Sequence, residues 1–252
     1  MTANHADSYH QLEDLSQEDL VRYLLNMSHR MNIHHTLWFR ETEHQLGMER
    51  ALDLLEEVTE QSSRIEMQRL GKTLGFEVED GIPKVFLDLP RETLLQLTAE
   101  FGKNWLATDG LWFQAIERAY GMNDAKRCND SCWHRFSQVE AHMIKTFLGL
   151  PERPGLAGLK QALGFRLYAR INVQSIIDES PTSIVFRMND CRVQSARKRK
   201  NLADYPCKSA GLVEYSRFAW GIDERIRTEC VGCPPDEHPD EWFCAWRFVL
   251  EE

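Results

Sequence analysis

The chain repeats itself over its first 150 residues, and this duplication constrains the fold more than any other feature of the sequence. Residues 14–76 align without a gap with residues 88–150 at an offset of 74, and 15 of the aligned positions are identical. The strongest shared block is Leu-Trp-Phe at residues 37–39 and again at residues 111–113. Self-similarity at a fixed period is typical of repeated supersecondary units. We therefore predict two copies of one helical unit.

Start and stop signals predict how each copy is built. Ser16 is a helix N-cap residue, and Pro90 at the matching position suits a first helical turn. Gly75 and Gly149 are typical C-caps. Each copy is expected to contain three helices: one from the cap, one carrying Leu-Trp-Phe, and one that ends at the C-cap glycine.

Two copies of a helical unit usually pack about a pseudo-twofold axis, because each buries a face that the other cannot bury alone. Matched positions then face each other across a seam that could hold a ligand. The predicted ligand-binding residues at this seam are Trp38, Glu43, Trp112 and Glu117. In the alternative interpretation, both tryptophans are ordinary core residues.

The two copies differ just before the Leu-Trp-Phe block. The first copy has His34 and His35 there, and His35 aligns with Asp109 of the second copy. A histidine and a carboxylate on either side of an axis could form an acid/base pair, so His34, His35 and Asp109 are the candidate catalytic residues. The alternative is that these residues cap helices.

The last third of the chain, residues 151–252, has a different pattern and is predicted to be a second domain after the helical region 1–150. β-branched residues and period-two alternation predict a hairpin, a helix and two further strands. The ranges are 171–178 and 184–193 for the hairpin, 208–221 for the helix, and 222–230 and 242–250 for the last strands, preceded by a helix at 159–169. The predicted fold class is α+β, with an antiparallel sheet.

Five of the seven cysteines fall within the last 62 residues. Cys230 and Cys233 form a C-x2-C pair, which lets two sulfurs hold one ion from a single turn. The predicted elements bring Cys207 and Cys244 to the same end of the sheet, so these four cysteines are the predicted metal ligands. Buried free thiols are the alternative.

Residues 155–250 resemble the vinyl-reductase-like family of small-molecule-binding domains, whose zinc site uses a cysteine, an acidic residue, x2, a cysteine and a last cysteine on the final strand. The matching positions are Cys207, Cys230, Cys233 and Cys244, with Cys230 in place of the acidic residue. The resemblance implies a structural zinc with four sulfur ligands, and an iron–sulfur cluster is the alternative. A weaker likeness is to the aminothiazoline-carboxylate hydrolase-like family.

Each of the three other cysteines could be a metal ligand or an ordinary structural thiol. Cys128 and Cys132 share a helix face and could bind a metal together, or they form a half-buried thiol pair. Cys191 is a fifth sulfur for the site or an ordinary strand residue.

Composition restricts the partners and the compartment. The net charge of −9 disfavours nucleic acid, and the basic run Arg192, Arg197, Lys198, Arg199 and Lys200 has no interleaved aromatic residues that would stack on bases. No stretch reaches the roughly 20 apolar residues of a membrane helix, and residues 1–10 lack the apolar region of a signal peptide. We therefore expect a cytoplasmic protein that does not bind membranes.

The sequence leaves two functions open. The first is a metal-containing protein that binds a small organic molecule and acts as an enzyme of small-molecule metabolism at the helical seam. The second is a non-catalytic ligand-binding or sensory module with purely structural zinc. A closed four-cysteine site leaves no open coordination position on the metal, so chemistry at the ion itself is not expected. A homodimer is compatible with either function.

Overall fold

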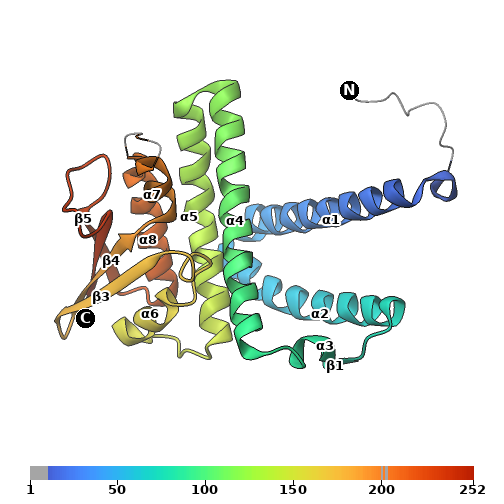
Figure 1. Ribbon diagram of the computed structural model, residues 1–252. Coiled ribbons are helices and arrows are strands. Elements are labelled where there is room, and N and C mark those ends of the chain that lie inside the picture. Colours follow the sequence, from blue (N-terminus) through green and yellow to red (C-terminus); the bar gives the residue numbers. More distant parts are fainter. Residues whose placement is uncertain (1–10, 200, 202–203) are drawn as a thin grey trace. The chain divides into compact units, whose positions relative to one another are not determined.

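The computed structural model describes residues 11–199, 201 and 204–252, and the chain divides into two compact units. Unit 1 ends at Leu70, and unit 2 comprises Gly71–Glu252. Helices make up the N-terminal part, and an antiparallel sheet lies in the C-terminal part (Figure 1). The fold is α+β, as the sequence predicts.

Unit 1 is built from two long helices. After a short 3-10 turn at Leu12–Asp14, α1 spans Gln17–Leu46 and α2 spans Met48–Leu74, the last turn of α2 belonging to unit 2. Ser16 caps α1, because its Oγ accepts a hydrogen bond from the Asp19 N–H at 3.1 Å. Gly47 lies between the helices at φ 89°, in a region that favours glycine.

The second copy of the repeat has the same construction in unit 2. Helix α4 spans Arg91–Tyr120 and α5 spans Met122–Phe147, with Gly121 at φ 92° between them. Both ends of α4 lie 74 residues after the ends of α1, which is the offset of the repeat. The duplication of the sequence is therefore a duplication of a helical pair.

The expectation of three helices per copy is wrong. The first two predicted helices form one continuous helix of 30 residues in each copy. The physical reason is the absence of a helix breaker: residues 17–46 contain neither proline nor glycine. The second copy has Gly102 and Gly110 inside α4, and an isolated glycine lowers helix stability without ending a helix.

Short elements connect the helices of unit 2 to its sheet. Strands β1 and β2, at Val78–Glu79 and Ile82–Pro83, form a two-stranded antiparallel pair that precedes α3 at Lys84–Leu87. After α5 comes α6, Gly155–Leu163, which ends earlier than the predicted 159–169 helix.

A four-stranded antiparallel sheet forms the C-terminal part of unit 2. Its strands are β3 Val173–Ser180, β4 Ser183–Asp190, β5 Ile226–Gly232 and β6 Cys244–Leu250. The order is β3-β4-β6-β5, so the last strand lies in the middle of the sheet. The predicted hairpin is present as β3 and β4. The predicted 208–221 helix is present as α8, Lys208–Ile222.

The end of the hairpin differs from the prediction. Strand β4 stops at Asp190, and the following segment forms a short helix, α7, at Arg192–Lys198. The basic run therefore begins on a helix. Lys200 of that run lies outside the described residues.

The core of unit 2 forms where α8 contacts both the sheet and α5 (Figure 1). Phe218 and Ile222 of α8 and Trp246 and Phe248 of β6 have no exposed surface. The ring of Tyr215 stacks on that of Trp246 with centroids 4.8 Å apart. Burial of large side chains at about 25 cal/mol per Å² of apolar surface is the main stabilising contribution here.

Gly211 of α8 lets the helix approach the sheet. An added Cβ at this position would lie 2.4 Å from Cζ2 of Trp246, whereas an added Cβ at Gly110 of α4 meets nothing within 4 Å. We expect Gly211→Ala to destabilise the protein by about 1–3 kcal/mol through overpacking. Gly110→Ala should stabilise it by up to about 1 kcal/mol, because alanine has the higher helix propensity. Urea denaturation of both variants checks this, and equal stabilities would contradict it.

Asp223, directly after α8, ties three segments together. Its carboxylate accepts hydrogen bonds from the Gly155 N–H at 2.9 Å and from Arg225 Nε and Nη2 at 3.0 and 2.8 Å. The side-chain hydrogen bonds from Arg225 are the largest cause that lowers the pKa of Asp223 from 3.8 to about 2. The stabilisation is therefore complete above the unfolded-state pKa and is lost as the pH falls through the folded-state pKa.

The lowered pKa of Asp223 gives a pH-dependent prediction for the variant Asp223→Asn. The variant should lose about 2 kcal/mol of unfolding free energy at pH 7 and about half of that at pH 3. Urea denaturation at the two pH values measures the difference. A loss that does not change with pH would show that the charge of Asp223 is not what stabilises the fold.

Among the residues that the structure describes, none of the helices combines the length and the apolar character needed to cross a lipid bilayer.

Candidate functional site: an aromatic cavity beside the clustered cysteines

A cavity of about 540 Å³ lies inside unit 2. Its wall is formed by residues of α4, α5, α7, α8 and β6, together with the segments that join them. Aromatic rings make up much of this wall: Trp105, Phe113, Trp133, Tyr168, Tyr205, Tyr215 and Trp246. A cavity of this size with mainly apolar walls and a few polar groups is typical of small-molecule sites.

A buried charged network supports the wall of the cavity. Arg166 is 1% exposed, and its Nε donates to Glu140 Oε2 at 2.8 Å while its Nη1 donates to Glu214 Oε1 at 2.8 Å. Tyr168 Oη donates to the same Glu214 oxygen at 2.7 Å. The guanidinium also lies over the ring of Phe218, 4.5 Å from its centre. One cation is thus held between two carboxylates and several aromatic rings.

Burial controls the protonation of this network. Burial raises the pKa of Glu214, and Arg166 opposes that shift by favouring the carboxylate. Burial also raises the pKa of Tyr168 well above its ordinary value, so the phenol stays protonated and donates a hydrogen bond to Glu214. Burial alone would lower the pKa of Arg166, but Glu140 and the other neighbours keep it well above its ordinary value. The guanidinium is therefore charged.

Four cysteines line one part of the same cavity: Cys191, Cys207, Cys233 and Cys244. The sulfurs of Cys207 and Cys233 are 3.5 Å apart. Hydrogen bonds with Cys207 and then with Cys244 are the largest causes that raise the pKa of Cys233. The same contact with Cys233 lowers the pKa of Cys207. Three of the four predicted metal ligands therefore meet.

The fourth predicted ligand, Cys230, packs against the same core but is not part of the cavity wall. Cys191 is on that wall, and burial raises its pKa to about 12. Within the described part of the chain, no three His, Cys, Asp or Glu side chains are arranged as a group that could hold a metal ion. All seven cysteines are free thiols, and Cys128 and Cys132 are exposed.

Gln194 of α7 connects the cysteines to the aromatic wall. Its side chain is 1% exposed and brackets the backbone of Tyr205: Nε2 donates to the Tyr205 carbonyl at 2.9 Å, and Oε1 accepts from the Tyr205 N–H at 2.8 Å. Nε2 also lies 3.6 Å from the sulfur of Cys207. One amide thus positions both a ring and a thiol of the site.

The predicted seam residues of α4 have different environments. Asp109 and Glu117 lie on the cavity wall, and burial raises the pKa of Asp109. Trp112 is 68% exposed and is not part of that wall. Within unit 2, two of the three predicted α4 residues are therefore beside the cavity.

The predicted residues of the first copy all lie on α1 in unit 1. Trp38 is 66% exposed and contacts the ring of His34 edge-on at 6.3 Å, and Glu43 pairs with Arg40 at 3.0 Å. His35 is exposed on the same helix. The acid/base pair of His35 with Asp109 links residues of different units and stays a prediction.

Several residues of the site were missed from the sequence. Arg166 and Glu214 lie in segments predicted as helices, where a charged residue is usually solvated, and no functional role is predicted for Gln194 or Tyr205. Glu140 offered one signal in the sequence. It is a charged residue, yet it is identical to Glu66 at the matching position of the repeat. A pairing partner for that carboxylate could have been sought in the C-terminal third.

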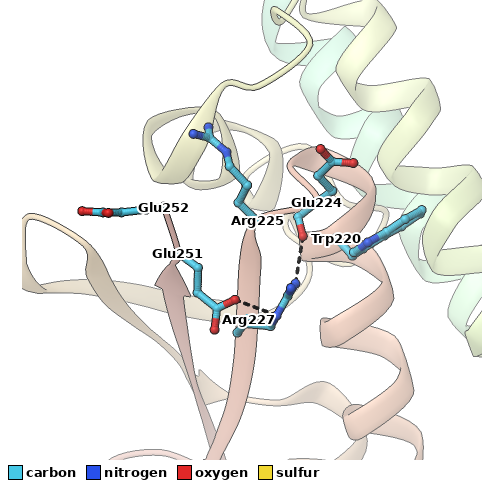
Figure 2. Close-up of a pocket in the computed structure, with 6 residues that line it drawn as sticks. All are labelled: Trp220, Glu224, Arg225, Arg227, Glu251 and Glu252. Carbon is cyan, nitrogen blue, oxygen red and sulfur yellow. Dashed lines mark hydrogen bonds and ion pairs between the residues drawn. The ribbon is translucent and has the colours of Figure 1, made fainter.

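A second hollow, of about 350 Å³, lies on the surface of unit 2 and is shown in Figure 2. Both arginines of this hollow already have partners. Arg227 contacts Glu251 at 3.0 Å and donates to the Glu224 carbonyl at 2.8 Å (Figure 2). Arg225 is bound to Asp223, which does not line the hollow. Such a hollow has little binding capacity left, so the aromatic cavity is the candidate site.

The fold and the cavity together define an α+β protein in which a helical pair and a four-stranded sheet enclose a small-molecule-sized cavity with a cysteine cluster. The chain belongs to the family of unknown function DUF6125, which matches residues 13–89 and 87–250. The two matched segments begin 74 residues apart, which equals the offset of the internal repeat. No curated protein and no solved structure matches the sequence.

Proposed function

We propose that this protein is a cytoplasmic binding module for a small organic molecule, which occupies the aromatic cavity of unit 2. The observation that supports it best is the cavity itself, which has a volume of about 540 Å³ and aromatic walls built largely on helices and on a central strand. The resemblance of residues 155–250 to vinyl-reductase-like small-molecule-binding domains agrees with this proposal. The binding site differs from the predicted repeat seam, because its wall combines α4 and α5 with the C-terminal elements.

We further propose that the clustered cysteines bind a zinc ion. Tetrahedral zinc with Zn–S bonds of about 2.3 Å holds its sulfurs about 3.8 Å apart, and Cys207 and Cys233 are already 3.5 Å apart. Cys244 would be the third ligand, and Cys230 or Cys191 the fourth. A zinc ion bound by four sulfurs would hold α8, β6 and the loop after β5 together, and it would have no open position for catalysis.

Binding of a neutral fluorescent aromatic molecule tests the proposed cavity. N-phenyl-1-naphthylamine should increase its fluorescence on addition of the protein, because it enters an apolar environment. Gly110→Phe should abolish this increase: Gly110 lies on the cavity wall, and a side chain at this position meets open space. We expect at least a tenfold loss of affinity, since the added ring takes up space that the probe needs.

The matched control is Ala107→Phe, which adds the same ring on the exposed side of the same helix. This variant should bind the probe as the unmodified protein does. Equal binding by the Gly110→Phe variant, or equal loss in both variants, would show that the probe does not bind in the cavity and would count against the proposed function.

A further inference from the structure

Two carboxylates on the cavity wall have no partner of opposite charge among the residues that the structure describes. Neither Asp109 nor Glu117 makes a side-chain hydrogen bond or an ion pair with any described residue, and both are half-buried on α4. Burial is the cause that raises the pKa of Asp109, so the carboxylate has lost water without gaining a cation. Partial burial of unpaired charges is unfavourable, and a bound cation would relieve it.

The rest of the wall is also electronegative. The buried network contains one guanidinium, Arg166, and two carboxylates, Glu140 and Glu214. Of the two Glu214 oxygens, Oε1 accepts both hydrogen bonds from the network, and Oε2 accepts none from the described residues. Arg197 is the only basic side chain on the described wall. The summed charge therefore favours a cation in the cavity.

Tyr205 places an aromatic ring on the same wall. The ammonium of Lys126 already lies over this ring, 5.0 Å from its centre, and is 3.9 Å from Asp130. An aromatic ring among carboxylates is the environment in which organic cations are bound.

Trp246 adds an unsatisfied hydrogen-bond donor. Its ring lies on the cavity wall with no exposed surface, and its Nε1–H is buried without a hydrogen-bond partner among the described residues. A buried donor that lacks an acceptor costs about 1–3 kcal/mol. A ligand with an acceptor atom such as a hydroxyl oxygen would satisfy it.

We propose that the cavity selects a small organic cation: a protonated amine on an aromatic body that also carries a hydrogen-bond acceptor. The ammonium group would lie near one of the two carboxylates, Asp109 or Glu117, which are about two turns apart on α4, and the aromatic body would pack against the rings of the wall. This inference rests on the proposed binding function and names the chemical class of its ligand.

Three probes of one shape separate charge from shape: tyramine carries an ammonium group, 4-ethylphenol is neutral, and 3-(4-hydroxyphenyl)propionate carries a carboxylate. Titration calorimetry of the full chain at pH 7 should show that tyramine binds at least about tenfold more tightly than the other two. The affinity for tyramine should fall as the salt concentration rises, because salt screens the attraction between charges.

The variant Asp109→Asn/Glu117→Gln should lose this preference. We expect its affinity for tyramine to fall by about tenfold or more and its affinity for 4-ethylphenol to stay within about twofold. Its melting temperature should not fall, because it removes two partly buried charges that have no ion-pair partner among the described residues. Glu92→Gln is the matched control: it removes an exposed carboxylate from the same helix and should bind all three probes as the unmodified protein does.

Three results would overturn the inference. If the neutral or the anionic probe binds as tightly as tyramine, the cavity does not select cations. If the double variant keeps the preference for tyramine, Asp109 and Glu117 are not the groups that select the cation, and the inference is wrong. In both cases the proposed binding function stands. If none of the three probes binds, the inference is also wrong. Binding of N-phenyl-1-naphthylamine then decides separately whether the cavity binds small molecules.

Discussion

Replacement of Arg166 by alanine is expected to destabilise unit 2 by about 3–5 kcal/mol. The guanidinium is fully buried and hydrogen-bonded to Glu140 and Glu214, so its loss leaves two carboxylates buried without a cation. It also leaves an apolar space beside Phe218. Six of the seven tryptophans lie in unit 2, so urea denaturation followed by tryptophan fluorescence reports on this unit.

Two further variants separate the charge effect from a general effect of losing an arginine. Arg227→Ala breaks an exposed ion pair: the side chain of Arg227 is 55% exposed and that of its partner Glu251 is 54% exposed. This variant should lose less than about 1 kcal/mol of unfolding free energy. Arg166→Met combined with Glu140→Gln and Glu214→Gln removes all three charges and should recover part of the stability lost in Arg166→Ala. A loss below about 1 kcal/mol in Arg166→Ala would contradict the role of this network.

Removal of the proposed zinc ion is expected to have the second large effect. Structural zinc sites contribute about 10–16 kcal/mol of apparent binding free energy in small domains, so a chelator should lower the melting temperature of unit 2 markedly. Elemental analysis should find about one equivalent of zinc per chain. Fewer than about half an equivalent of zinc or iron would contradict the metal site.

Serine variants identify the ligands. Cys233→Ser should lose the metal, because Cys233 contacts both Cys207 and Cys244. Cys128→Ser is the matched control, since that thiol is exposed, and should keep the metal. If Cys230→Ser loses zinc, Cys230 is the fourth ligand. If Cys191→Ser loses zinc instead, Cys191 is the fourth ligand. Visible absorption with bound iron and no zinc would instead indicate an iron–sulfur cluster.

The helical repeat shows what a sequence pattern predicts well. Two aligned copies must form the same structure, and α1 and α4 do begin and end at matching residues. The same comparison does not predict what each copy buries. No residue of α1 is buried in the structure, whereas Trp105 of α4, at the position matching Met31, packs against Trp133 and Tyr168.

The site shows where sequence reasoning fails. Asp109 and Glu117 were selected because of the repeat, and they lie on a cavity wall whose other side comes from α7, α8 and β6. Arg166 was missed because a single charged residue in a helical segment looks like a solvated one. Its burial depends on two carboxylates that are 26 and 48 residues away in the chain.

The sequence by itself determined the local features: the duplicated helices, the glycines between them, the hairpin, helix α8 and the cysteines near the end. These follow from periodicity, caps and spacing, which act within a few residues along the chain. Only the tertiary structure decided that the cavity lies within unit 2, that Cys191 is on its wall and that Asp109 and Glu117 are unpaired among the described residues. Those properties depend on contacts between distant segments, and the free energy of such contacts is set by packing and burial.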